Sequence, residues 1–196
     1  MPRELTTKGL ATRSRIVEHA AAVARERGVA QTSLECVRAS AKVSNSQLFH
    51  YFPDGKAALM LAVARHGADA ILADQEARLG GANTWRAWEE WAEALCAHYE
   101  SQGSRCDLTT LLSQLDPDNP GVQAILVDVF DTWERVLADA IRGMQAVRKI
   151  RPDLDADSTA QVVVAGIVGS TMHMAATGTT ARLRTTMRAT LTSLRG

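Results

Sequence analysis

Residues 32–52 read TSLECVRASAKVSNSQLFHYF, and this stretch carries the clearest helix-start signals of the chain. It contains two patterns in which a Ser or Thr is followed three residues later by Glu or Gln. The two pairs are Thr32 with Glu35 and Ser44 with Gln47. Each pattern predicts a capping box, in which two side chains satisfy free backbone N–H groups at the start of a helix. We therefore predict a short helix over 34–41, a tight turn at 42–44 and a second helix over 45–52.

Two short helices joined by a tight turn form a helix-turn-helix when apolar side chains hold the pair together. Four apolar residues are suitably placed: Leu34, Val37, Val43 and Leu48. In such a unit the N-terminal end of the second helix enters the major groove of DNA. Here that end carries Asn45, Ser46 and Gln47, whose side chains can hydrogen-bond base edges. The stretch therefore predicts a DNA-binding module.

Residues from about 8 to 72 resemble the DNA-binding domain of the tetracycline-repressor (TetR) family of bacterial regulators. That domain has a Thr before its second helix, a Val-Ser turn, a third helix ending in Leu-Tyr-x-Tyr-Phe, and a Lys at the start of helix four. The matching residues are Thr32, Val43-Ser44, Leu48-Phe49-His50-Tyr51-Phe52 and Lys56. The resemblance implies that Thr32, Tyr51 and Lys56 bind phosphates. It also implies four groove-facing side chains, those of Asn45, Ser46, Gln47 and His50.

Three residues depart from the family pattern, namely Arg38, Lys42 and Phe49. Lys42 stands where the turn usually has Gly, so a left-handed backbone there costs about 1–2 kcal/mol. The lysine also places a cation near the DNA backbone, and we include it and Ser44 among the DNA-binding candidates. Phe49 replaces a Tyr, and we expect it in the interior together with Phe52, because phenylalanine is usually buried.

The whole chain has 196 residues, of which 46% are hydrophobic, and this is enough to bury a substantial core. Apolar residues recur at helical spacing, for example at Ile16, Ala20 and Val23, and no stretch shows the alternation typical of a strand. We predict an all-α protein with two domains. Residues 1–55 form a helix-turn-helix DNA-binding domain, and residues 56–196 form a helical ligand-binding and dimerisation domain.

The net charge is zero, but the charges are unevenly distributed. Residues 1–56 contain nine Lys or Arg against five Asp or Glu, so the remainder, with thirteen against seventeen, is acidic. A basic front suits contact with a polyanion such as DNA. No apolar run approaches the roughly 18 residues of a membrane span, and the N-terminus lacks a signal-peptide pattern. We expect a cytoplasmic protein without a membrane partner.

Aromatic residues recur along one predicted helix, and two more follow on a later one. They are Trp85, Trp88, Trp91 and Tyr99, then Phe130 and Trp133. Such a stripe is typical of a packed core. Four tryptophans also suit a cavity, because small-molecule sites are largely apolar with a few polar groups. We therefore name these six residues and His173 as candidate contacts for a hydrophobic or aromatic effector, with His98 and Cys106 as further polar candidates.

The segment 158–176 is rich in small and apolar residues and carries little charge. A helix that is apolar around most of its circumference is buried on more than one side. The next helix adds Leu183, Met187, Leu191 and Leu194. In TetR-like proteins the last two helices form a four-helix dimer interface, so the resemblance implies a homodimer through these helices. The alternative is a core within one chain.

The sequence shows no catalytic or metal-binding pattern: no Gly-rich phosphate loop, no paired His or Cys ligands and no nucleophile elbow. We therefore expect neither an enzyme nor a cofactor. The predicted function is a ligand-responsive repressor that a small effector releases from a palindromic DNA operator. One alternative is a DNA-binding redox sensor that uses Cys96 and Cys106. Another is a helical enzyme that uses the aromatic pocket and has lost DNA binding.

Overall fold

The computed structural model describes residues 5–102, 115 and 118–195, and in that part of the chain it contains helices and no strand. The all-α prediction is confirmed. The helices are α1 (Thr7–Arg27), α2 (Leu34–Ala41), α3 (Asn45–Tyr51), α4 (Gly55–Leu79), α5 (Trp85–Gln102), α7 (Pro120–Ala146), α8 (Ala156–Thr177) and α9 (Ala181–Arg195). The two short helices of the helix-turn-helix agree with the predicted bounds, except that α3 ends one residue earlier.

Side-chain caps define where the short helices begin. Ser44 and Gln47 form the predicted capping box: the Gln47 backbone N–H donates to Ser44 Oγ at 3.1 Å, and the Ser44 N–H donates to Gln47 Oε1 at 3.0 Å. The box predicted at Thr32 is wrong. The N-cap of α2 is Ser33, whose Oγ accepts from the Cys36 N–H at 3.2 Å. The N-cap is the residue directly before the first helical residue. Because α2 begins at Leu34, that residue is Ser33 and not Thr32.

The turn between α2 and α3 contains a left-handed residue that is not glycine. Lys42 has φ 52° and ψ 50° and caps the end of α2. The Lys42 N–H donates to the carbonyl groups of Ala39 and Arg38, and the Val43 N–H donates to the Arg38 carbonyl at 3.2 Å. These bonds satisfy carbonyl groups that the helix end leaves free. The protein thus tolerates strain of about 1–2 kcal/mol at Lys42 in order to turn sharply into α3.

The first three helices enclose a small core. Its buried side chains include Ile16 from α1, Val37 from α2 and Leu48 from α3, with Phe52 directly after α3. α2 packs against α1, and α4 packs against α1 on leaving the unit. Phe52 is therefore in the interior as predicted. Phe49 is not: half of its surface is exposed, because Leu48 and Phe52 already fill the inward face of a seven-residue helix.

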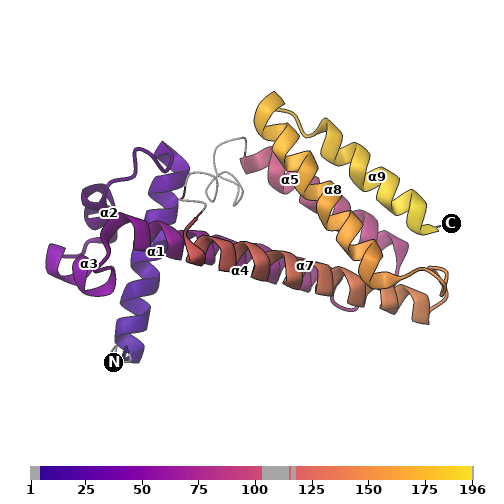
Figure 1. The fold of residues 1–196 in the computed structure, drawn as a ribbon, viewed down its shortest axis with the longest axis horizontal. Helices are drawn as coiled ribbons and strands as arrows, with labels where there is room; N and C mark the ends of the chain where they lie inside the picture. The colour runs from indigo at the N-terminus through magenta and orange to yellow at the C-terminus, as the bar shows by residue number, and fades with distance from the viewer. Residues whose placement is uncertain (1–4, 103–114, 116–117, 196) are drawn as a thin grey trace.

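α4 and α7 lie side by side along the length of the molecule (Figure 1). Arg65 on α4 pairs with Asp128 on α7 at 2.6 Å. α8 packs on α7, and α9 packs on both α8 and α5. Arg184 joins α9 to α5 through Glu93 and Glu100 at 2.8 and 2.9 Å, and these carboxylates raise the pKa of its guanidinium.

One continuous core includes buried side chains from α1 to α9. The domain boundary predicted between residues 55 and 56 falls in the first turn of α4. α4 packs against α1 of the first predicted domain and against α5 and α7 of the second. α4 therefore contacts elements of both predicted domains.

α8 combines an apolar composition with incomplete burial. By length and composition alone it could cross a membrane, but part of it is buried inside the protein. Val162 and Met172 are 72% and 63% exposed on it. α8 therefore packs on α7 and α9 with one side and leaves apolar side chains uncovered on the other.

Candidate nucleic-acid interface and ligand sites

The outward face of α3 is formed by four exposed side chains on consecutive turns. They are Asn45, Ser46, Phe49 and His50. Asn45 lies four residues before Phe49, and Ser46 lies four residues before His50, so each pair shares one side of the helix. Leu48 fixes the rotation of α3 because it is buried on the opposite side. Gln47 is exposed on α3 as well, so all four predicted groove-facing side chains are exposed there, together with Phe49, which sequence reasoning had placed inside.

The capping box limits what two predicted DNA contacts can do. Ser44 Oγ accepts from the backbone of Gln47, and Gln47 Oε1 accepts from the backbone of Ser44. The side-chain oxygen of Gln47 is therefore already engaged, and only its two Nε2–H donors are available to DNA. Asn45 makes no hydrogen bond within the described part of the chain and has its whole amide available. An amide reads adenine with both its donor and its acceptor, so Asn45 is the better equipped of the two.

The predicted phosphate contacts differ in availability. Thr32 is 1% exposed and its hydroxyl donates to the Gly28 carbonyl at 2.8 Å, so its side chain connects α1 to α2 inside the protein. Lys56 Nζ donates to the Ala30 carbonyl at 3.2 Å and can exchange this exposed partner for a phosphate. Tyr51 is half-buried, with its ring edge-on to His50 at a centroid distance of 4.9 Å. Because this contact already restricts the Tyr51 ring, its hydroxyl would lose little side-chain freedom on binding a phosphate.

The aromatic stripe of α5 is largely core. Trp88 and Trp91 are buried, and both indole N–H groups have protein partners: the Ala82 carbonyl at 3.1 Å and Gln75 Oε1 at 2.6 Å. Trp85, Trp88 and Trp91 form an edge-to-face series with centroid distances of 6.4 and 5.9 Å. Saturated hydrogen bonds and close packing of this kind indicate structural roles.

The remaining surroundings of the predicted ligand contacts differ from one residue to the next. The Trp85 ring faces the Arg195 guanidinium at 4.8 Å, on the side of α9. His173 lies on a shallow groove between α8 and α9 and contacts Thr177. Trp133 is different, because its side chain is buried and its Nε1–H has no hydrogen-bond partner among the residues that the structure describes. Phe130 is half-buried on the same helix, and Tyr99 is buried on α5.

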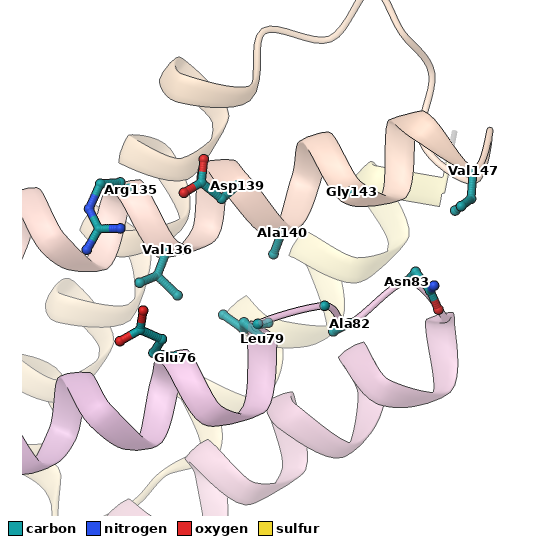
Figure 2. Close-up of a pocket in the computed structure, with 12 residues that line it drawn as sticks. Glu76, Leu79, Ala82, Asn83, Arg135, Val136, Asp139, Ala140, Gly143 and Val147 are labelled. Atoms are coloured by element: carbon teal, nitrogen blue, oxygen red, sulfur yellow. The ribbon is translucent and has the colours of Figure 1, made fainter.

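A groove that no sequence pattern indicated lies between the end of α4 and α7 (Figure 2). Its volume is about 330 Å³, and Leu79, Val136 and Ala140 form an apolar floor. Figure 2 shows Glu76 and Arg135 at one end of it. Only the packing of α4 against α7 creates this hollow, so a sequence pattern could not reveal it.

The redox alternative named Cys96 and Cys106. Cys96 is buried, and burial raises the pKa of its thiol, while Cys106 lies outside the described residues. The third cysteine, Cys36 in α2, was not part of that alternative. A hydrogen bond with the Ser33 side chain lowers the pKa of the Cys36 thiol, and Arg27 lies 3.6 Å from its sulfur. Its position in the first turn of a predicted helix is the sequence signal that could have identified it, whereas Arg27 is brought near it by the fold.

Two sequence models of protein families match the chain. The model described as "Bacterial regulatory proteins, tetR family" matches residues 16–63. The model described as "Tetracyclin repressor-like, C-terminal domain" matches residues 83–190, more than half of the chain. No curated protein matches the sequence. The two matches include both the helix-turn-helix and most of the helical remainder.

Solved structures with the same fold extend over nearly the whole chain. The reduced form of Escherichia coli NemR is 15% identical, with coverage of 95% of this chain and 98% of that one and a TM-score of 0.77. A putative TetR-family regulator from Mesorhizobium loti is 16% identical, with coverage of 96% and 97% and a TM-score of 0.78. GusR of Salmonella enterica is 25% identical, with coverage of 98% and 99% and a TM-score of 0.65.

Proposed function

The chain belongs to the TetR family of bacterial regulatory proteins, and from that premise we propose that it is a homodimeric, ligand-responsive repressor of transcription. In this proposal the dimer occupies a palindromic operator in double-stranded DNA, and a small effector releases it. As a regulator of DNA it works in the cytoplasm. The observation that supports the proposal most strongly is the exposed, rigidly capped face of α3.

The DNA contacts divide into base readers and phosphate binders. Asn45, Ser46 and His50 supply hydrogen-bonding groups to base edges, and Gln47 supplies only its Nε2 donors to acceptors such as those of guanine. Lys42, Tyr51 and Lys56 flank this face and bind phosphates, which positions α3 without specifying the sequence. Ser44 contributes indirectly, because its side chain holds the first turn of α3.

The dimer uses the uncovered side of α8 together with α9. Val162 and Met172 are exposed there, and a groove of about 630 Å³ between the two helices is lined by small residues such as Gly166, Gly169 and Ala181. Small side chains allow helices of two subunits to approach closely, and an isologous interface buries the same patch twice. The two copies of α3 must then lie about 34–36 Å apart to reach successive major grooves.

The effector proposal centres on Trp133. A buried N–H without a partner costs about 1–3 kcal/mol, and a ligand acceptor would satisfy it. Phe130, one turn earlier on α7, supplies apolar surface beside it. A hydrophobic or aromatic effector with one hydrogen-bond acceptor therefore suits this part of α7. Since α4 packs along α7, a ligand bound at α7 would shift α4 and, through it, the helix-turn-helix. To convert a protein that is 99:1 in the DNA-binding conformer to 1:99, the effector must prefer the other conformer by about 5.5 kcal/mol.

Selection of binders from a pool of randomised DNA duplexes tests the DNA-binding part of the proposal. We expect an enriched inverted repeat whose half-site centres are about 10–10.5 base pairs apart or a multiple of that spacing. Sedimentation tests the dimer: Val162→Asp on α8 should yield monomers, whereas Val127→Asp, equally apolar and exposed on α7, should not. A pool without enrichment, or dimers that survive the α8 change, would contradict the proposal.

The effector is tested with compounds that release the selected duplex. Such compounds should bind Trp133→Phe about tenfold more weakly than the unchanged protein, because the variant keeps an apolar ring and lacks the N–H. Trp85→Phe is the matched control, since Trp85 contacts Arg195 on another side of the molecule. Equal affinity for both variants would place the effector elsewhere, with the groove between α4 and α7 as the next site to probe (Figure 2).

A further inference from the structure

We propose that Phe49 reads a thymine methyl group, so that each half-site of the operator carries a thymine at the base pair opposite this ring. The inference rests on the proposed function and makes it more specific. It assigns sequence discrimination to a residue that has no hydrogen-bonding group and that the sequence alone placed in the core.

The position of the ring supports this role. Phe49 is 50% exposed and lies one helical turn after Asn45 and Ser46 on α3, so it shares their side of the helix. Leu48, its immediate neighbour, is buried on the other side. When the first turn of α3 faces base edges, the phenyl ring faces the base edges one turn further along the groove.

No packing or ring contact with the described residues accounts for the exposed ring. Phe49 belongs neither to the core nor to the partly buried residues packed against it. Its aromatic neighbours are engaged elsewhere: Phe52 has Arg13 over its ring at 5.1 Å, and His50 contacts Tyr51. Within the described part of the chain Phe49 has no ring or cation contact of this kind. A large apolar side chain on a polar recognition face therefore points to an apolar partner outside the chain.

The chemistry of the major groove leaves one such partner. Guanine, adenine and cytosine present hydrogen-bond donors and acceptors there, and thymine alone presents a methyl group. A phenyl ring placed over the polar edges would remove water from groups that it cannot hydrogen-bond. The same ring over a thymine methyl buries apolar surface on both sides. Phe49 thus favours thymine by attraction and disfavours the other bases by desolvation.

Replacing single thymines by deoxyuridine tests the inference, because this removes the methyl group and leaves the hydrogen-bonding edges intact. The probe is the duplex selected from the randomised pool. We expect one thymine in each half-site at which deoxyuridine weakens binding of the unchanged protein about fourfold, as the loss of one buried methyl-sized group implies. Phe49→Ala should bind the thymine and deoxyuridine duplexes equally well.

Two further variants make the result specific to this ring. Val127→Ala removes another exposed apolar side chain, on α7, and should keep the full fourfold effect. Phe49→Leu keeps an apolar side chain and should retain part of it, which supplies a measurement if Phe49→Ala binds weakly. A deoxyuridine effect that is absent, or that persists unchanged in Phe49→Ala, would overturn the inference while leaving the repressor proposal intact. A pool without an enriched duplex would overturn both.

Discussion

The Trp91 indole N–H donates to the side-chain oxygen of Gln75 at 2.6 Å, and both residues are buried. This bond joins α5 to α4, the helix that links the helix-turn-helix to the rest of the protein. Trp133 on α7 is also buried, and within residues 5–102, 115 and 118–195 its N–H has no such partner. Two tryptophans that were both predicted as ligand contacts therefore differ: the Trp91 N–H bonds α5 to α4, and the Trp133 N–H is an unused donor among the described residues.

The Trp91–Gln75 bond should be measurable by substitution. Trp91→Phe leaves the Gln75 amide buried without its partner, which costs about 1–3 kcal/mol beyond the loss of packing. Trp133→Phe removes the same atoms from a buried site and breaks no hydrogen bond. Trp133→Phe also removes a buried N–H that is unsatisfied among the described residues, so we expect urea unfolding to show Trp91→Phe less stable than Trp133→Phe by at least about that amount. Equal losses would mean that the bond contributes nothing to stability.

Lys42→Gly should raise the free energy of unfolding by about 1 kcal/mol, because glycine adopts a left-handed backbone without strain. Arg148, with φ 59°, is the only other non-glycine residue of positive φ in the described part of the chain. Arg148→Gly should give a similar gain in thermal melts and leave DNA affinity unchanged. Lys42→Gly should weaken DNA binding through the lost cation. A loss of affinity in both variants, or in neither, would argue against a DNA contact at Lys42.

Cys36 should react with iodoacetamide faster than Cys96. The Ser33 hydrogen bond lowers the pKa of the Cys36 thiol, so more thiolate is present as the pH rises toward neutrality, whereas burial raises the pKa of the Cys96 thiol. Mass spectrometry of peptides after timed alkylation of the folded protein measures both rates, and urea-unfolded protein provides the reference. Faster modification of Cys96 would contradict this order and revive the predicted redox role of that residue.

Lys56→Ala should weaken binding to all duplexes about equally and reduce the magnitude of the salt slope by about 0.9 per half-site. In the free protein Lys56 is held by the Ala30 carbonyl, an exposed bond that costs little to exchange. Lys149→Ala is the matched control, since Lys149 also donates to a loop carbonyl, that of Asn83, and comes after α7. Binding titrations with DNA at several salt concentrations give the slope of the logarithm of affinity against the logarithm of salt concentration. An unchanged slope in Lys56→Ala would mean that this lysine does not contact the DNA.

The helix-turn-helix was predictable because its determinants are local. A capping box occupies four consecutive residues, and the Ser44–Gln47 pair fixed the start of α3. The same reasoning failed at Thr32, where two neighbouring residues can both cap and packing selects Ser33. Phe49 was misplaced because average burial preference was given more weight than its position next to Leu48, whose inward direction already turns residue 49 outward.

The candidate ligand site was less predictable because its surroundings depend on contacts between distant helices. The spacing of Trp85, Trp88 and Trp91 shows that they share a face of α5, and it cannot show that Gln75 of α4 meets one of their N–H groups. The missing partner of Trp133 is likewise visible only in three dimensions. The groove between α4 and α7 has no linear signature, because its lining comes from residues about sixty positions apart in the chain.

The central claim, that the outward face of α3 reads a DNA sequence, is tested most directly by one ratio. This is the affinity for the selected duplex divided by the affinity for a scrambled duplex of the same composition, measured at fixed salt for the unchanged protein and for Asn45→Ala/Ser46→Ala. Both residues are exposed, so the double variant should keep its melting temperature. We predict that it retains its affinity for the scrambled duplex while the ratio falls at least tenfold, since each lost base contact costs about 1–3 kcal/mol of discrimination. An unchanged ratio in a folded double variant would contradict the account.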